Sequence, residues 1–295
     1  MHPPPLRKVG REAAGEARFS ILIPTWNNLP YLQLCLDSIR RHSHFRHQLI
    51  VMINEGSDGT LEWVDAQPDL DYVYSPANIG VCYGLNACRA LVRTGYLAYV
   101  NDDMYLLPGW DRALWREIEA VGHDRFMLSG TMIEPHPSDN QCVIFQDYGD
   151  DLASFREADL LRDYASFEKS DWTGSTWPPN LLPVGLWDLV GGMSTEFSPG
   201  MYSDPDLSMK LWQAGVRYFK GVGDSRVYHF ASKSTGRVKK NDGRKLFLKK
   251  WGMTSNFFTT RFLRRGAPFT GPLSEPELSA GDRWKNRVKE VMSSF

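Results

Sequence analysis

The chain has 295 residues, 42% of them hydrophobic and 23% charged, with a formal net charge of -1. This composition is that of a folded globular protein with one large domain or two small ones, and it excludes a chain that is disordered throughout. No apolar run reaches the roughly 18 residues of a membrane span. Four cysteines occur, none in a CxxC pair, which argues against a disulfide framework or a thiolate zinc site and predicts buried, free thiols.

Residues 1–18 contain basic residues without an apolar stretch, so we expect a flexible leader and not a signal peptide. From residue 19 onward, apolar runs alternate with helical patterns. Strands are predicted at 19–24, 49–53, 72–74, 96–100 and 126–129, with helices around 32–42, 60–67, 81–92 and 110–121. Residues 134–182 have weaker periodicity and several prolines, which predicts a long irregular insertion. A further helical pattern begins near residue 207, and His229 lies in a strand-like run.

This alternation predicts an α/β fold with a mostly parallel central sheet and helices on both faces, followed by a C-terminal helical extension. In such sheets ligands bind beyond the carboxyl ends of the strands. Two polar clusters, at residues 54–58 and 101–103, directly follow predicted strands. The sequence therefore predicts that both clusters face one crevice.

Several common catalytic motifs are missing from the chain. It has no G-x-x-x-x-G-K-[ST] loop, no G-x-S-x-G elbow and no H-E-x-x-H, and no G-x-G-x-x-G follows its first predicted strand. These absences argue against an ATPase, a serine hydrolase, a zinc protease and a nicotinamide dehydrogenase.

A few polar residues could carry chemistry, but each also has an ordinary structural explanation. Asp102 and Asp103 follow an apolar strand, where carboxylates can hold a divalent cation, although such a pair is more often a solvated turn. His229 on its own is more often structural. Ser203 or Asp204 would ordinarily cap the helix that begins beside them.

The order of the motifs adds a resemblance to a known family. The motifs are FSILIPTWNN, NEGSDGT, NIGVCYGLN, YVNDDMYLLPGW, VGGMSTEF, YSDPDLSMKLWQAG and VYHFASKSTG. In this order they resemble the family 2 glycosyltransferases, which have the GT-A fold, over residues 19–240. The resemblance implies an inverting enzyme that moves a sugar from a nucleotide diphosphate donor to a hydroxyl of a glycan or lipid-linked acceptor, with Mg²⁺ or Mn²⁺ as cofactor.

The resemblance also implies roles for individual residues. The expected donor-binding residues are Pro24, Thr25, Asn54, Glu55, Asn78, Gly80, Asn86, Asn101, Asp102 and Asp103. Asp103 is expected to be the principal metal ligand, with His229 as a second ligand. Gly191, Gly192 and Ser203 are expected on the acceptor side, and Asp204 is expected to be the general base.

Three positions depart from the family's pattern. Asn54 replaces a common aspartate, so recognition of the base or ribose would run through Glu55 or Asp102. Asn101 replaces the first aspartate of D-x-D, which removes one charge from the metal site. Ser203 replaces the glutamate of a Glu-Asp pair. Both the metal-binding and the basic carboxylates are retained, which favours an active enzyme.

Two other functions remain open from the sequence. A non-catalytic nucleotide-sugar-binding protein is favoured if the replacements at Asn54 and Asn101 abolish metal binding. A sugar-1-phosphate nucleotidyltransferase is less favoured, because the glycine-rich loop expected near its N-terminus is absent. Donor turnover would separate these functions.

The expected domains are the leader at 1–18, a catalytic domain at 19–240 and a basic, aromatic helical extension at 241–295. Within the catalytic domain, residues 19–131 would bind the nucleotide sugar and residues 132–240 the acceptor. The absence of a predicted signal peptide or membrane span favours a cytoplasmic location. The oligomeric state is left open, with a dimer as one option.

Positive charge is concentrated near the C-terminus. The segment from Arg237 to Arg265 has ten cationic residues and one acid, Asp242, so the rest of the chain is acidic. Aromatic and leucine residues are interleaved with these cations. The pattern predicts contact with an anionic acceptor or peripheral attachment to the inner face of an anionic membrane. Alternatively, the aromatics dock the segment onto the catalytic domain or a second subunit. No nucleic-acid-binding motif accompanies the charge, so nucleic acid is not an expected partner.

Overall fold

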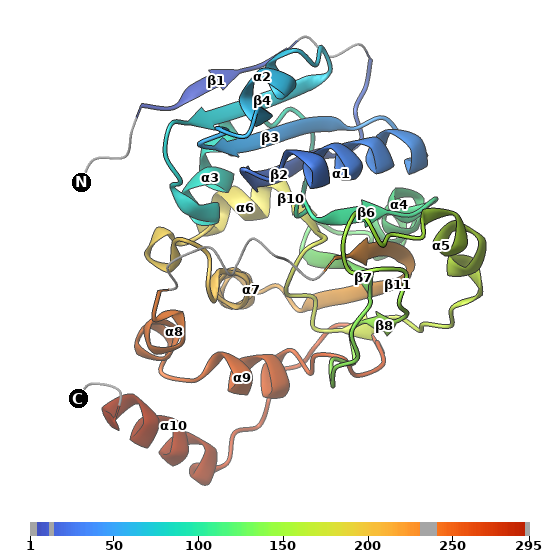
Figure 1. Cartoon of the computed structure of the whole chain (residues 1–295). Coiled ribbons are helices and arrows are strands. Elements are labelled where there is room, and N and C mark those ends of the chain that lie inside the picture. The colour runs from blue at the N-terminus through green and yellow to red at the C-terminus, as the bar shows by residue number, and fades with distance from the viewer. Residues whose placement is uncertain (1–4, 12–14, 231–240, 293–295) are drawn as a thin grey trace.

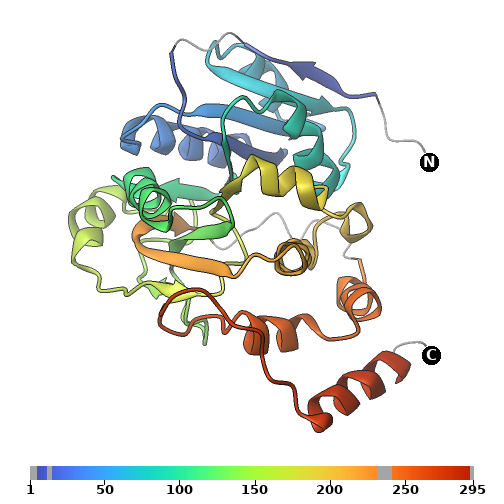
Figure 2. The same ribbon diagram turned by 180° about the vertical axis from the view of Figure 1, so that it is seen from behind.

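The computed structural model describes residues 5–11, 15–230 and 241–292. Within them, one sheet carries helices on both faces (Figures 1 and 2). Its strands are β1 (Arg7–Val9), β2 (Ser20–Trp26), β3 (Gln48–Asn54), β4 (Leu70–Ser75), β5 (Tyr96–Tyr99), β6 (Met104–Leu106), β7 (Phe126–Glu134), β8 (Ile144–Phe145), β9 (Trp172–Thr173), β10 (Asn180–Pro183) and β11 (Tyr218–His229). The α-helices are α1 (Leu29–His42), α2 (Thr60–Asp65), α3 (Gly80–Cys88), α4 (Trp110–Val121), α5 (Glu157–Asp163), α6 (Val184–Val190), α7 (Ser203–Gln213), α8 (Gly243–Trp251), α9 (Ser255–Phe257) and α10 (Ala280–Met292). Short turns of helix lie at Arg89–Leu91, Tyr164–Ser166, Thr195–Phe197 and Phe258–Phe262.

The main path of the sheet has the strand order β1-β4-β3-β2-β5-β10-β7-β11-β6. Strands β4, β3, β2 and β5 are parallel neighbours, and β7 pairs in parallel with β11. Strand β10 lies antiparallel between β5 and β7, so β7 and β11 point in the same direction as β5. Strands β1 and β6 are antiparallel at the two edges. The predicted α/β fold with a mostly parallel sheet and helices on both faces is confirmed.

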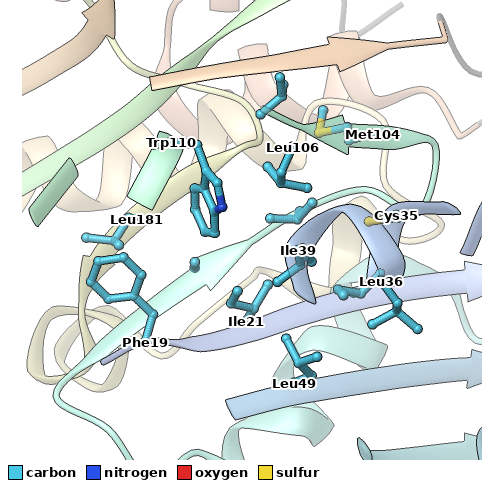
Figure 3. Packing of buried hydrophobic residues seen from close by; sticks show 14 of the residues in the cluster. Phe19, Ile21, Cys35, Leu36, Ile39, Leu49, Met104, Leu106, Trp110 and Leu181 are labelled. Carbon is cyan, nitrogen blue, oxygen red and sulfur yellow. The ribbon is translucent and has the colours of Figure 1, made fainter. Parts of the chain in front are cut away.

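The two faces of the sheet bury separate apolar clusters. Along β2, Ile21 and Ile23 belong to the cluster under α1, α2 and α4, whereas Leu22 belongs to the cluster on the other face. A strand buried on both faces reads as a continuous apolar run, which is why the segment was recognisable in the sequence. Figure 3 shows the first cluster, where Leu36 and Ile39 of α1 pack beside Leu49 and Trp110.

The second face is covered by α3, α6, α7 and the C-terminal helical segments. Phe247 of α8 and Phe258 and Phe262 of the following turn are buried in this cluster together with Trp212 of α7. Of the two explanations for the aromatic C-terminal segment, the structure therefore supports docking onto the catalytic domain. Residues 231–240, which include Arg237, Lys239 and Lys240, lie outside the described residues.

Two predictions about irregular segments were wrong. Within the leader that was expected to be flexible, residues Arg7–Val9 form β1, which pairs with β4 at the edge of the sheet. The supposed irregular insertion at 134–182 contains helix α5 and begins strand β10, which lies in the middle of the sheet. Both strands are short, and their pairing partners are distant in sequence, so local periodicity could not reveal them.

The four cysteines are free and buried, as predicted. None of the helices in the described residues is long and apolar enough to cross a membrane.

Helix α8 contacts α7 through the buried carboxylate of Asp206. The carboxylate of Asp206 is fully buried, and its Oδ1 lies 2.9 Å from Nζ of Lys250 and accepts a 2.8 Å hydrogen bond from Nε1 of Trp251. Its Oδ2 accepts a 2.5 Å hydrogen bond from Oγ of Ser194. Lys250 also pairs with Glu196 at 2.7 Å. These contacts join the C-terminal extension to the body of the protein.

We expect Lys250→Met to lower the free energy of unfolding by about 3 kcal/mol, the lower end of the range for breaking a buried ion pair, because Ser194 and Trp251 still donate to Asp206. Lys249→Met is the matched control: the neighbouring lysine is exposed, and its loss should change stability by less than about 0.5 kcal/mol. Urea denaturation measures both values. Equal stabilities of the two variants would contradict the anchoring role of Lys250.

Candidate active site

Polar groups from three parts of the chain lie at or beyond the ends of strands of the sheet. Asn54 ends β3, residues 101–103 join β5 to β6, and His229 ends β11. Because β11 pairs antiparallel with β6, His229 lies opposite Met104 and therefore next to Asp103. Two clusters and one histidine that the sequence analysis singled out thus lie at one edge of the sheet.

Asp103 is the carboxylate most clearly available for a ligand. It is 5% exposed, and neither Oδ1 nor Oδ2 has a hydrogen-bond partner among the described residues. Within the same part of the chain, Nε2 of His229 has no hydrogen-bond partner either, and it lies 3.6 Å from Oδ1 of Asp103, which is an ion-pair distance. Nδ1 of His229 lies 2.9 Å from Oε1 of Glu134, which orients the ring. Burial alone would lower the pKa of His229, but the carboxylates of Asp103 and Glu134 outweigh it and raise the pKa to about 9.

Asp204 lies in the first turn of α7. Its side chain keeps partial access to solvent, but protein atoms surround it closely, and this desolvation raises the pKa of Asp204 to about 7. Its carboxylate makes no hydrogen bond to any described residue. The cap position of α7 is Tyr202, and no side chain caps the helix. The alternative role of Asp204 as a helix cap is therefore not supported.

Asp206 differs sharply from Asp204 although both lie in the same turn. The Asp206 carboxylate is fully buried and is occupied by Lys250, Ser194 and Trp251, as described above. Of the two aspartates, only Asp204 makes no side-chain hydrogen bond or ion pair to a described residue.

Tyr99 lies within electrostatic range of both Asp103 and Asp204. Burial raises the pKa of its phenol well above the usual value, and the negative charges of Asp204, Asp103 and Asp102 raise it further. All three aspartates are therefore close enough to Tyr99 to act on it electrostatically. Asp204 and the Asp102–Asp103 pair thus lie on the same side of the sheet as the Tyr99 phenol, within electrostatic range of it.

The residues expected around the nucleoside lie together at the ends of β2 and β3. Thr25 is buried, and its Oγ1 has no hydrogen-bond partner. Oε2 of Glu55 accepts hydrogen bonds from Nε1 of Trp26 at 2.6 Å and from Nδ2 of Asn27 at 3.0 Å. Asn54 is buried, and its Oδ1 accepts a 3.0 Å hydrogen bond from the backbone N–H of Ile79. Asn54 thereby positions the segment that leads into α3.

Asn78, Gly80 and Asn86 hold α3 against the second half of the domain. Oδ1 of Asn78 accepts a 2.9 Å hydrogen bond from the N–H of Gly80. Gly80 has φ of +78°, and a Cβ there would lie 2.4 Å from Oγ of Ser198. The side-chain amide of Asn86 bonds both the N–H and the C=O of Met193, each at 2.8 Å. Asn86 therefore joins the two halves, and its contact with a donor stays a prediction.

Gly191 and Gly192 lie where Asn86 joins the two halves. Gly191 ends α6 with φ of +72°, and Gly192 follows with φ of +62°. A Cβ on Gly192 would lie 2.3 Å from Oδ1 of Asn86. Ser203 is buried, and its Oγ donates a 2.6 Å hydrogen bond to the carbonyl of Gly200. These residues shape the approach to Asp204, and an acceptor contact remains a prediction for each.

The remaining predicted residues line the same edge. Pro24 is half-buried in β2, and Asn101 is half-buried at the end of β5, where its carbonyl accepts from Sγ of Cys35 at 3.6 Å. Asp102 and Asp103 are buried, which argues against the alternative of a solvated turn. The connection between β5 and β6 folds them inward because β6 returns into the sheet beside β11.

Two buried polar residues at this end of β5 and β10 were not singled out by the sequence analysis. Tyr99 lay inside an apolar strand, and Asn180 lay in the segment that was expected to be irregular. A single asparagine after two prolines carries no local signal of a site, and only its position between β5 and β7 reveals it.

Residues 20–148 match the sequence model of the family described as Glycosyl transferase family 2. No curated protein is similar enough in sequence to count as a relative. Structural similarity extends over more of the chain. The structure of S. aureus TarS 1-349 in complex with UDP-GlcNAc matches with a TM-score of 0.58 and 13% identity, covering 94% of this chain and 72% of that one. The longer S. aureus TarS chain is covered to 43%.

Two further solved structures share the fold. GalNAc-T7 with UDP, GalNAc and Mn²⁺ matches with a TM-score of 0.56 and 9% identity over 79% of this chain and 48% of that one. The mannosyltransferase PcManGT from Pyrobaculum calidifontis, in complex with GDP-Man and Mn²⁺, matches with a TM-score of 0.50 and 16% identity over 83% and 63%. Together with the family match, these structures confirm the resemblance and the GT-A fold that the motifs predicted.

Proposed function

We propose that this chain, a glycosyltransferase that carries its family 2 domain at residues 20–148, transfers a sugar with inversion from a nucleotide diphosphate donor to a hydroxyl of a glycan or lipid-linked acceptor. One observation carries the proposal. Two carboxylates without hydrogen-bond partners among the described residues, Asp103 and Asp204, both lie within electrostatic range of Tyr99. In an inverting transfer, one carboxylate can hold a cation that offsets the charge of the leaving diphosphate, and the other can accept the proton of the attacking hydroxyl.

Asp204 is the proposed general base. A carboxylate whose pKa lies at about 7 is a better proton acceptor near neutral pH than an ordinary aspartate, and half of it remains ionised at that pH. The absence of a competing hydrogen bond leaves its oxygens free for the acceptor hydroxyl. Asp206, which is occupied by Lys250, cannot take this role.

Asp103 and His229 are the proposed ligands of a divalent cation. Among the described residues, no group of three or more His, Cys, Asp and Glu side chains could hold a metal by itself. The fit therefore rests on two protein ligands: the oxygens of Asp103 and Nε2 of His229 are buried, have no hydrogen-bond partner among the described residues, and face each other at 3.6 Å. Diphosphate oxygens and water would complete the coordination. When bound, Mg²⁺ or Mn²⁺ would offset the negative charge that accumulates on the leaving diphosphate. GalNAc-T7 and PcManGT, which share the fold, both have structures with Mn²⁺.

In the proposed reaction, the acceptor oxygen forms a bond to the anomeric carbon while the bond from that carbon to the diphosphate oxygen breaks. Asp204 takes the proton of the acceptor hydroxyl, and the nucleoside diphosphate leaves with the bonding electron pair. A single displacement from the opposite face inverts the anomeric centre. Thr25 and Glu55 at the ends of β2 and β3 would hold the nucleoside, and Asn78 and Gly80 would lie near the phosphates.

A screen of nucleotide sugars tests the function directly. UDP-GlcNAc and GDP-Man, which are bound in structures of the same fold, belong in the panel together with the other common UDP and GDP sugars. A donor that binds the native state raises the melting temperature, and we expect that rise to depend on Mn²⁺. Slow release of the sugar from the matching donor, faster with an acceptor, would show transfer. Binding without any turnover would instead favour the non-catalytic binding protein.

We further propose that residues 19–131 form the donor half of the catalytic domain and residues 132–240 the acceptor half, with the extension packed beside the latter. Residues 231–240 lie outside the described residues, and the described part of the acceptor half includes α6 and α7, which border Asp204. A cytoplasmic location with peripheral contact at the membrane suits a lipid-linked acceptor.

The exposed cations of the extension lead to a prediction about membranes. Arg244 and Lys249 of α8 are exposed, as is Arg264 beyond it, whereas Lys250 is used in docking. We expect the protein to co-sediment with vesicles that contain an anionic lipid at low salt, because each basic residue near such a surface adds about 1 kcal/mol of attraction. High salt, or the double variant Arg244→Ala/Lys249→Ala, should reduce binding. Lack of binding at low salt would refute the membrane contact without affecting the catalytic proposal.

A further inference from the structure

The side-chain amide of Asn180 is buried without hydrogen bonds to the described residues. The residue is 2% exposed, and neither Nδ2 nor Oδ1 has a hydrogen-bond partner in the described parts of the chain. Buried amides are almost always hydrogen-bonded, because leaving one unpaired costs the folded state free energy. An amide with both ends unpaired in the interior therefore calls for a ligand that completes it.

The sheet register places this amide on the catalytic face. Asn180 begins β10 and pairs with Tyr99 of β5 on one side and with Ser129 of β7 on the other. Residues that pair directly across neighbouring strands present their side chains to the same face of the sheet. Tyr99 belongs to the apolar cluster under α3, α6 and α7, as does Leu182, two residues after Asn180. The side chain of Asn180 therefore faces the helices that carry Asp204.

The neighbours of Asn180 link it to α7. On the β7 side, the sulfur of Met127, two residues before Ser129, accepts from Oγ of Ser208 at 3.8 Å. Ser208 is one turn beyond Asp204 in α7, and its Oγ also bonds the Asp204 carbonyl at 3.0 Å. On the β5 side, the phenol of Tyr99 lies within electrostatic range of Asp204, Asp103 and Asp102. Asn180 therefore lies on the side of the sheet that α7 covers, beside a residue that is near both the proposed metal ligand and the proposed base.

We propose that the amide of Asn180 binds hydroxyl groups of the transferred sugar, with Nδ2 donating to one oxygen and Oδ1 accepting from a hydroxyl. The inference rests on the proposed function and deepens it, because the space between the diphosphate and the base is where the sugar ring must lie. A side-chain amide matches a pair of neighbouring hydroxyls, since it offers one donor and one acceptor side by side. Asn180 is then a specificity-determining residue for the sugar and not for the nucleotide.

Ser20 provides a matched control at the other end of the strands. It is also fully buried in the sheet, but its Oγ is bonded to Oε1 of Gln48 at 2.5 Å and to Oγ1 of Thr94 at 2.9 Å. Ser20→Ala removes bonds that the free protein makes, whereas Asn180→Ala removes none. The two variants should therefore have opposite effects on stability and on sugar recognition.

The experiment compares Asn180→Ala, Asn180→Asp and Ser20→Ala with the wild type. The probes are UDP, GDP, the best donor from a panel of UDP and GDP sugars, and the monodeoxy analogues of that donor, all with Mn²⁺. For Asn180→Ala we expect nucleoside diphosphate affinity within about twofold of wild type, kcat/KM for the donor reduced by about tenfold or more, and the preference for the parent donor over one deoxy analogue abolished. Ser20→Ala should lower the melting temperature and keep that preference.

Each outcome supports or refutes the sugar-binding role of Asn180. If Asn180→Ala keeps the preference for the parent donor, or loses UDP or GDP affinity to the same degree as donor affinity, the sugar-binding role is wrong, and an ordered water satisfies the amide instead. If Asn180→Ala does not fold, Asn180→Asp, which keeps the shape and one acceptor, answers the same question. A wild-type chain that binds no nucleotide at all would refute the proposed function itself, which is a different result.

Discussion

Asp204→Asn should lower kcat by about 10²- to 10⁴-fold while donor affinity stays close to that of the wild type. Asparagine has the same shape as aspartate but cannot accept the proton of the acceptor hydroxyl. The structure makes this substitution informative, because the Asp204 carboxylate makes no hydrogen bond to a described residue that the variant would break. Steady-state kinetics together with calorimetry of nucleotide binding measures the two quantities.

The matched comparison is Asp206→Asn, one half-turn away. This substitution weakens the ion pair with Lys250 and should reduce stability, but it removes no catalytic group. If Asp206→Asn lost turnover as severely as Asp204→Asn while remaining folded, the assignment of the base would be wrong.

The same residue sets an expected pH dependence. The base must be ionised, so kcat/KM of the wild type should fall by about tenfold per pH unit below the pKa of Asp204, which is about 7. Stability should change in the opposite direction. Because burial raises the pKa above the ordinary value of 3.8, the folded state binds this proton more tightly than the unfolded state does. The stabilisation is complete below pH 3.8 and is lost as the pH rises to about 7. Asp204→Asn should therefore melt at a higher temperature than the wild type at pH 8, with little difference at pH 4.

Asp103→Ala should abolish the Mn²⁺-dependent part of UDP or GDP binding, a loss of about 100-fold or more if the carboxylate is a direct ligand. Both of its side-chain oxygens are buried without a hydrogen-bond partner, so they are available to a cation. Isothermal titration calorimetry with and without Mn²⁺ separates the metal-dependent affinity from the rest.

Asp69→Asn serves as the control, because Asp69 lies on the surface and pairs only with Arg40 among the described residues. It should leave the metal dependence intact. A wild-type response to Mn²⁺ in Asp103→Ala would remove Asp103 from the metal site, and His229→Ala would then show whether the histidine alone matters.

The sequence by itself determined the strands and helices that have a clear local pattern. Strands β2, β3 and β5 are buried on both faces and read as apolar runs, and the spacing of Leu32, Cys35 and Leu36 placed α1. Such elements can be read because each depends on neighbours within one helix turn or one strand. Asp103, His229 and Asp204 became candidates through the order of the motifs and their resemblance to the family 2 glycosyltransferases, since their local patterns alone favoured structural roles.

Only the tertiary structure decided which candidate side chains are bonded to other residues. Asp204 and Asp206 stand in the same turn of the sequence, and it is Lys250, on a distant helix, that occupies one and leaves the other open. Asn180 gained its place in the crevice because β10 inserts antiparallel between β5 and β7. Strand β1 formed only by pairing with β4. In each case the deciding contact joins residues far apart in the chain, and the free energy of such a contact depends on burial and partners that no local pattern of residues specifies.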